Sequence, residues 1–127
     1  MRALAALLLA AAPAAACPPL ATEAEVAALL DGPAECRTGL AQGGGRFVNC
    51  GWTFPYRDKG ARTAFEAVAA RLAPCGPGLP KRSDVGVNHP DSYASHTVAL
   101  PSGTVTVALK DKAPLSRSLV FVTLTAE

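Results

Sequence analysis

Apolar and polar residues alternate along residues 46–56, and this is the clearest periodic pattern in the chain. Every second position carries a large apolar side chain or a cysteine: Val48, Cys50, Trp52, Phe54 and Tyr56. A period of two predicts a β-strand that turns one face toward a hydrophobic core. Pro55 indicates that this strand ends there or lies at an edge of its sheet.

Two other stretches follow the helical period. Residues 22–25, Thr-Glu-Ala-Glu, have the form of a capping box, and the apolar residues behind them share one face until Gly32. This pattern predicts a short helix of about nine residues. Residues 60–73 place an alanine-rich apolar stripe along one face and stop at Pro74, which predicts a second and longer helix.

The C-terminal third of the chain predicts strands. Residues 96–100 and 104–110 flank the tripeptide Pro-Ser-Gly at 101–103, which is typical of a tight hairpin turn. Residues 117–125 form a nearly continuous apolar run, which indicates a central strand.

The predicted order is therefore helix, strand, helix and then three strands. This order is typical of an α+β fold, with two helices packed on one face of a mostly antiparallel sheet of four or five strands. The fifth strand would come from Val85 and Val87, in the Pro- and Gly-rich stretch 74–95.

Residues 1–16 have the layout of a secretory signal peptide. Arg2 provides a positive start, an apolar run follows it, and three alanines form the small-residue cleavage site. The apolar run is shorter than the ~20 residues that a membrane-spanning helix needs. We therefore expect residues 17–127 to form one exported domain, in the periplasm or outside the cell, without a transmembrane segment.

A lipoprotein signal is the alternative reading of the same segment. Cys17 directly follows the alanines, and bacterial lipoproteins are cleaved before a cysteine that is then acylated. The lipoprotein pattern usually has a leucine or another larger aliphatic residue three positions before that cysteine. Ala14 stands at this position, which favours ordinary cleavage.

Composition excludes several classes of protein. Of the 127 residues, 50% are hydrophobic and 17% are charged, with a formal net charge of +2. The apolar content is too high for a disordered chain, and the small, scattered charge argues against a nucleic-acid binder. Abundant alanine, arginine, glycine and proline, with little lysine, asparagine or isoleucine, is typical of a GC-rich bacterial genome.

All four cysteines follow the predicted signal peptide: Cys17, Cys36, Cys50 and Cys75. An even number in an exported chain predicts two disulfides, and the lack of a Cys-x-x-Cys pair argues against zinc or redox chemistry. The strand around Cys50 and the helix before Cys75 have similar predicted lengths, so a strand-to-helix return would bring the two cysteines level. We therefore expect Cys50–Cys75 and, by elimination, Cys17–Cys36.

Residues 88–96 hold both histidines of the chain. His89, Asp91 and His96 could bind a ligand or a metal such as zinc, or one histidine could serve as a base for a nearby serine. No known ligand spacing is matched, and His-Pro-Asp is also ordinary turn chemistry. We therefore expect no metal and no cofactor, and keep these three residues as binding candidates.

Arg57 and Lys59 lie between the predicted strand and the second helix. Cations at this place could grip an anionic group close to the helix N-terminus, although a solvated charged turn is the simpler interpretation. The sequence contains no Gly-x-Ser-x-Gly, His-Glu-x-x-His or phosphate-loop motif, so it offers no catalytic set.

These patterns favour a small exported domain that binds rather than catalyses. Its partner would be another protein of the bacterial envelope or a small ligand, and not a nucleic acid. The alternatives are a small periplasmic metal-binding protein or hydrolase that uses His89, Asp91 and His96, and an envelope lipoprotein acylated at Cys17.

Overall fold

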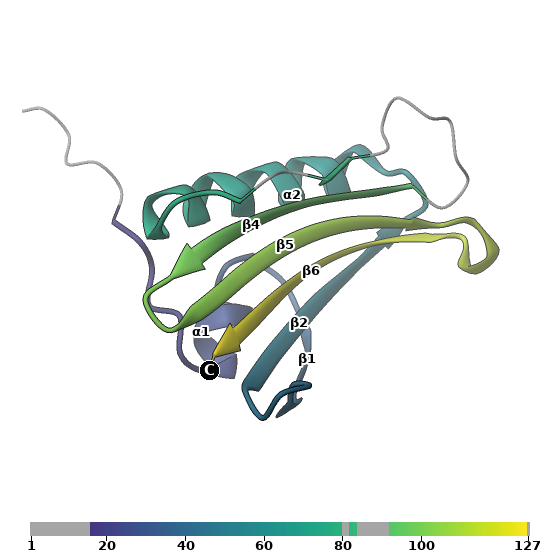
Figure 1. Ribbon diagram of the computed structural model, residues 1–127. Coiled ribbons are helices and arrows are strands. Elements are labelled where there is room, and N and C mark those ends of the chain that lie inside the picture. The colour runs from purple at the N-terminus through teal and green to yellow at the C-terminus, as the bar shows by residue number, and fades with distance from the viewer. Residues whose placement is uncertain (1–15, 80–81, 84–91, 127) are drawn as a thin grey trace, which may run out of the picture.

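The computed structural model describes residues 16–79, 82–83 and 92–126 of the chain. Within them, one antiparallel sheet has the strand order β1-β2-β6-β5-β4-β3 (Figure 1). The elements follow the chain as α1 (Glu23–Ala27), β1 (Glu35–Leu40), β2 (Arg46–Pro55), α2 (Lys59–Leu72), the 3-10 turn η1 (Ala73–Cys75), β3 (Arg82–Ser83), β4 (Tyr93–Leu100), β5 (Gly103–Lys112), the 3-10 turn η2 (Ala113–Leu115) and β6 (Arg117–Ala126). The expected α+β class and antiparallel sheet are confirmed.

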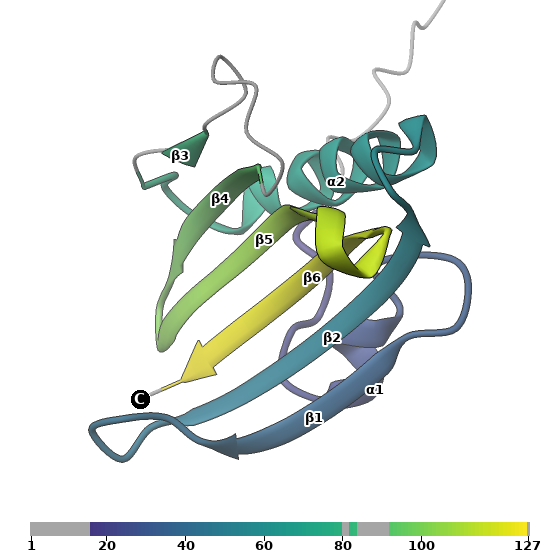
Figure 2. The same cartoon turned by 90° about the vertical axis from the view of Figure 1, so that its right-hand side faces the viewer.

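One face of the sheet forms the floor of the hydrophobic core. Trp52, Val120 and Leu109 are paired across β2, β6 and β5, so their side chains share this face. Phe65 of α2 and Val26 of α1 belong to the same buried cluster. Figure 2 shows both helices on the same side of the curved sheet. We call this side the inner face, and the opposite side of the sheet the open face.

Most of the elements predicted from periodicity are present. The strand expected over residues 46–56 is β2, the longer helix is α2, and the two strands around the Pro-Ser-Gly turn are β4 and β5. The capping box is also confirmed, because Thr22 Oγ1 accepts from the Glu25 N–H at 3.2 Å and Glu25 Oε1 accepts from the Thr22 N–H at 3.0 Å. The helix behind it is shorter than expected, with five residues.

Strand β1 is absent from the predicted order, which the described residues correct to α-β-β-α-β-β-β-β, with six strands instead of four or five. β1 escapes the periodicity argument because it lies at the sheet edge and its side chains are mostly outside the core. Gly43 and Gly44 form the turn to β2, each with φ of +93°, a conformation that favours glycine. The short strand β3 is Arg82–Ser83; Val85 and Val87 lie outside the described residues.

The segment after α2 covers the outer edge of β4. The Leu79 N–H donates to the Thr97 carbonyl at 2.8 Å, and the Ala99 N–H donates to the Pro77 carbonyl at 2.9 Å. Strand β3 continues this pairing toward the start of β4. Gly76 approaches so closely that a Cβ there would lie 2.0 Å from the Ala99 carbonyl oxygen. The chain thus protects one edge of its own sheet.

Two disulfides cross-link the fold, as expected, but the cysteines pair differently from the prediction. The bonds are Cys17–Cys75 and Cys36–Cys50, instead of Cys17–Cys36 and Cys50–Cys75. The prediction was wrong because α2 does not return along β2. It crosses the inner face over β6 and β5, so that Cys75 ends beside β4, and these two strands separate β4 from β2, which carries Cys50.

The pairing also bears on the lipoprotein alternative. Acylation of a lipoprotein cysteine forms a thioether at its sulfur, and the Sγ of Cys17 is already bonded to Cys75. The disulfide and the lipid therefore exclude each other, which argues against acylation of Cys17. Among the described residues, no helix has the length and apolar character that crossing a bilayer demands.

We expect the two disulfides to contribute unequally to stability. The chain-entropy relation gives about 4 kcal/mol for the 58-residue Cys17–Cys75 separation and about 3 kcal/mol for the 14-residue Cys36–Cys50 separation. Urea unfolding of the paired alanine variants, Cys17→Ala with Cys75→Ala and Cys36→Ala with Cys50→Ala, measures both losses. Mass mapping of the unreduced protein checks the pairing itself, and a Cys50–Cys75 peptide would contradict it.

Candidate functional site

The structure places His96 partly buried between β4 and α2. His96 lies on the inner face of β4, and its ring centroid is 5.2 Å from that of Phe65 on α2. His89 and Asp91 lie outside the described residues, so the three-residue metal site stays a prediction. Within the described ranges, no three histidine, cysteine or carboxylate side chains gather as metal ligands would.

Arg57, the second candidate, holds an anion that belongs to the chain itself. It follows β2 with φ of +54°, and its N–H donates to Ser118 Oγ at 2.8 Å. Its Nε lies 3.4 Å from Asp111 Oδ2, and its guanidinium carbon lies 5.1 Å from the centroid of the Tyr56 ring. The neighbouring Lys59 is the exposed first residue of α2. The turn therefore binds an anionic group, as its positive charge suggested, but this group is the Asp111 carboxylate of the same chain.

Asp111 is the centre of this polar cluster. Its side chain is 10% exposed, and it sits on the inner face at the end of β5. Ser118 Oγ donates to Oδ1 at 2.5 Å, and Ser92 Oγ donates to Oδ2. The backbone N–H of Asp111 also donates to the Ser92 carbonyl at 2.9 Å. The cluster therefore joins the starts of β4 and β6 to the end of β5 and to the turn before α2.

Opposing effects act on the pKa of Asp111. Burial disfavours the charged carboxylate and acts to raise the pKa. The hydrogen bonds from Ser118 and Ser92, together with the positive charge of Arg57, act in the other direction and outweigh burial. The net result holds the pKa of Asp111 below its ordinary value, so the group is ionised at neutral pH.

The geometry of the cluster is structural rather than catalytic. Both serine hydroxyls donate to Asp111, so neither is oriented toward a base that could activate it. Ser92 and His96 are four residues apart along the strand direction, or about 13 Å. Ser92, Asp111 and His96 therefore do not form a serine–histidine–aspartate arrangement.

The feature with the strongest binding character lies on the open face of the sheet. A groove of about 540 Å³ runs there from β1 to β5. Its lining includes apolar, polar and charged residues: Glu35, Cys36, Arg37, Asn49, Gly51, Thr53, Lys110, Lys112, Leu119 and Phe121. Gly51 lies opposite Phe121, and the absent side chain leaves the surface hollowed at this point.

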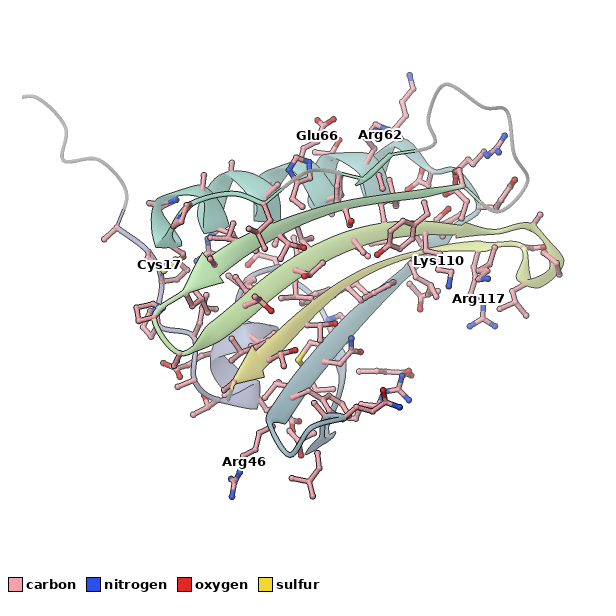
Figure 3. All side chains as sticks on the ribbon, in the orientation of Figure 1. Cys17, Arg46, Arg62, Glu66, Lys110 and Arg117 are labelled. Atoms are coloured by element: carbon pink, nitrogen blue, oxygen red, sulfur yellow. A yellow bond between two sulfur atoms is a disulfide. The ribbon has the colours of Figure 1, made fainter. Side chains whose placement is uncertain are left out.

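Three cations meet at one end of this groove, and we call Lys110, Lys112 and Arg117 the cationic corner. Lys112 stands directly opposite Arg117 in the β5–β6 register, so their Cβ atoms are about 5 Å apart. Lys110 lies two positions before Lys112, on the same face of β5. None of the three makes an ion pair within the described residues. In Figure 3, Lys110 and Arg117 point away from the side that α2 covers.

The floor beside the cationic corner is apolar and held in place. Leu119 and Phe121 project from β6 next to the lysines, and both remain partly exposed. Further along the face, Asn49 Nδ2 donates to Thr123 Oγ1 at 2.8 Å across β2 and β6. This cross-strand bond restricts the side chains around the groove, so the face is pre-ordered before any partner arrives.

The sequence carries a signal for this face in the residues that alternate with buried ones. Lys110 and Lys112 alternate with the buried Asp111, and Leu119 and Phe121 alternate with buried β6 residues. The period of two therefore defines a second face with its own apolar and cationic character. Pairing β5 with β6 was needed to show that the two sets of residues adjoin.

We expect Asp111→Asn to lower the free energy of unfolding by about 2 kcal/mol at neutral pH, because an amide cannot replace the charged acceptor of this cluster. The folded-state pKa lies below the unfolded value of about 3.9, so this stabilisation is present above that pH and is lost as the pH falls through the folded-state pKa. Urea unfolding across pH measures the difference from the natural protein.

The difference should be constant from about pH 5 to pH 8 and should shrink below about pH 4. Glu66→Gln on the outer side of α2 is the matched control, with no comparable loss expected. An Asp111→Asn loss that is equal at low and neutral pH would contradict the electrostatic assignment.

Comparison with known proteins adds no assignment to this geometry. No protein-family model, curated protein or solved structure matches the chain. The case for a function therefore depends on the open face and on its chemistry.

Proposed function

We propose that this protein is an exported, non-enzymatic binding domain of the bacterial envelope. Its open face would bind an acidic segment of a partner protein. The single observation that carries the proposal is the cationic corner, where Lys112 and Arg117 stand directly opposite each other and no carboxylate of the described residues pairs with either. Like charges in directly opposed cross-strand positions destabilise a sheet, and an acidic partner would relieve this repulsion.

The groove beside the cationic corner supports a polypeptide as the partner. Leu119 and Phe121 offer apolar contact next to the cations, so the face suits a segment that combines acidic and apolar side chains. An extended segment places every second side chain on the same side, at a spacing of about 7 Å. This spacing matches the step from Lys110 to Lys112 along β5.

Charge separates the open face from the rest of the described surface. On strands β1, β2, β4, β5 and β6, its charged residues are four cations and one carboxylate: Arg37, Lys110, Lys112, Arg117 and Glu35. By contrast, the outer side of α2 carries charges of both signs, including Arg62 and Glu66 (Figure 3). Complementary charge of this kind steers partners and fixes their orientation more than it adds affinity.

The polar cluster and the disulfides support the remaining parts of the proposal. The hydroxyls of Ser92 and Ser118 donate to the Asp111 carboxylate, and no described histidine is placed to activate them as nucleophiles. This arrangement favours binding over catalysis. Structural disulfides persist in oxidising compartments, which favours an exported protein. Export itself follows from the predicted signal peptide in residues 1–16.

A short labelled peptide tests the proposal. The probe is fluorescein-labelled Glu-Ser-Glu-Ser-Leu-Ser-Leu, which presents two acidic and two apolar side chains on one side when extended. We expect it to bind the natural protein in a salt-sensitive way, measured by fluorescence anisotropy. Joint Lys110→Glu and Lys112→Glu should weaken binding by about tenfold or more, because attraction becomes repulsion at the cationic corner.

Two controls make the result specific. Arg62→Glu on α2 changes the net charge by the same kind of substitution and should leave binding unchanged. The matching probe with lysine in place of glutamate should not bind. Equal binding of both peptides, or an unaltered affinity after the two lysine reversals, would refute the assignment of this face.

A further inference from the structure

The two edges of the sheet are treated differently by the chain. Residues 76–79 and β3 cover the outer edge of β4, through the hydrogen bonds described above. Strand β1 forms the other edge, and no described segment pairs with its outer side (Figure 2). An uncovered edge strand presents backbone groups that can pair with another chain.

The register shows which backbone groups of β1 point outward. The Cα atoms of Cys36 and Cys50 are 4.1 Å apart, a separation typical of a non-hydrogen-bonded antiparallel pair. The Ala41 N–H, in contrast, donates to the Gly45 carbonyl at 2.6 Å within the same hairpin. Odd-numbered residues of β1 therefore bond toward β2. The N–H and C=O groups of Cys36 and Thr38 point to the open edge.

This edge is held rigid even though it buries little. Only Cys36 of β1 packs against the hydrophobic core, while Leu40 is 76% exposed. The disulfide to Cys50 fixes the strand covalently to β2. On the open face, the Phe47 ring lies over Gly39, where an added Cβ would meet the ring carbon Cε1 at 2.8 Å. A strand that would otherwise fray is thus kept extended and ready to pair.

Charges on β1 are self-complementary about Cys36. Glu35 and Arg37 flank Cys36, are exposed, and share the open face. When two copies of β1 pair in antiparallel fashion about Cys36, Glu35 of each copy stands opposite Arg37 of the other. Both pairs fall at non-hydrogen-bonded positions, where opposed side chains are closest. We infer that β1 is a dimerisation edge, and that its partner is a second copy of this chain.

The charge pattern also selects the register of this dimer. A slip of two residues in one direction would place Glu35 opposite Glu35 of the other copy, and a slip of two residues in the other direction would oppose the two Arg37 side chains. Directly opposed like charges are unfavourable, so both shifted registers are penalised. The register centred on Cys36 makes about six backbone hydrogen bonds between the copies, because Ala34 pairs with Thr38 on either side.

A two-fold axis through this pair stands perpendicular to the sheet. The two sheets then join into one continuous sheet, and the two open faces lie on the same side. Each cationic corner lies on β5 and β6, away from the dimer edge, and stays accessible. The dimer would therefore display two copies of the open face in one plane, although it forms whether or not that face binds an acidic partner.

Charge reversal tests the dimer in the full protein with both disulfides intact. Sedimentation equilibrium over a wide concentration range should show a monomer–dimer equilibrium for the natural protein. Arg37→Glu alone and Glu35→Arg alone should each weaken dimerisation by about tenfold or more, because both symmetric pairs become repulsive. The double variant, Glu35→Arg with Arg37→Glu, restores opposite charges and should recover the natural dissociation constant to within about threefold.

Amide hydrogen exchange provides a second readout. The Cys36 and Thr38 amides should be protected in the dimer and exchange quickly in either single variant, while β2 amides stay protected in all of them. Arg62→Glu should change neither measurement. A natural protein that stays monomeric at every concentration, or a double variant that fails to recover, would overturn the inference. Neither result would affect the peptide-binding test of the cationic corner.

Discussion

Burial of the inner sheet face beneath two helices is the interaction on which the rest of the structure depends. The part of the chain that the structure describes supplies one helix of fourteen residues and one of five, and both contribute to the same core as Trp52 and Val120. These two helices cover one face of the sheet. Because antiparallel strands alternate their side chains between faces, every residue opposite the core is placed on the open face. The uncovered surface is therefore a direct consequence of how the core is closed, and its residues are free to carry other chemistry.

The disulfides act where burial is weakest. Cys17–Cys75 ties the segment before α1 to the turn after α2, and Cys36–Cys50 ties the edge strand β1 to β2. Neither α1 nor β1 buries enough apolar surface to hold its place unaided, since Val26 is the buried residue of α1 and Cys36 is the residue of β1 that packs against the core. A domain of this size gains stability from such cross-links because they restrict the unfolded chain. They also keep the edge of the sheet in one conformation.

The elements that face the core could be predicted from the sequence. The elements that lie mostly outside the core could not be predicted in this way. Strand β2 and helix α2 were visible because their apolar residues repeat at the periods of two and 3.6 that burial imposes. Strand β1 has no such repeat, since its residues are mostly exposed. The missed strand also caused the wrong disulfide pairing. Cys36 and Cys50 are equidistant in sequence from Gly43, so a hairpin turning at this glycine would have placed the two cysteines opposite each other.

For the candidate site, Arg57 was recognised as an anion-binding residue, but its anion, Asp111, becomes adjacent only when β5 reaches the turn after β2.

Strand β5 shows how one period of two can separate two electrostatic roles. Asp111 points to the inner face, where two serines and Arg57 satisfy its charge and hold its pKa low. Lys110 and Lys112 point to the open face, where the charged residue directly opposed to them within the described strands is another cation, Arg117. A carboxylate placed on the open face would neutralise the lysines, but it would leave Arg57 and the buried serines without their acceptor. The alternation Lys-Asp-Lys therefore closes the fold on one side with a satisfied ion pair and places two cations on the other. The same strand that stabilises the core thus determines the charge of the open face.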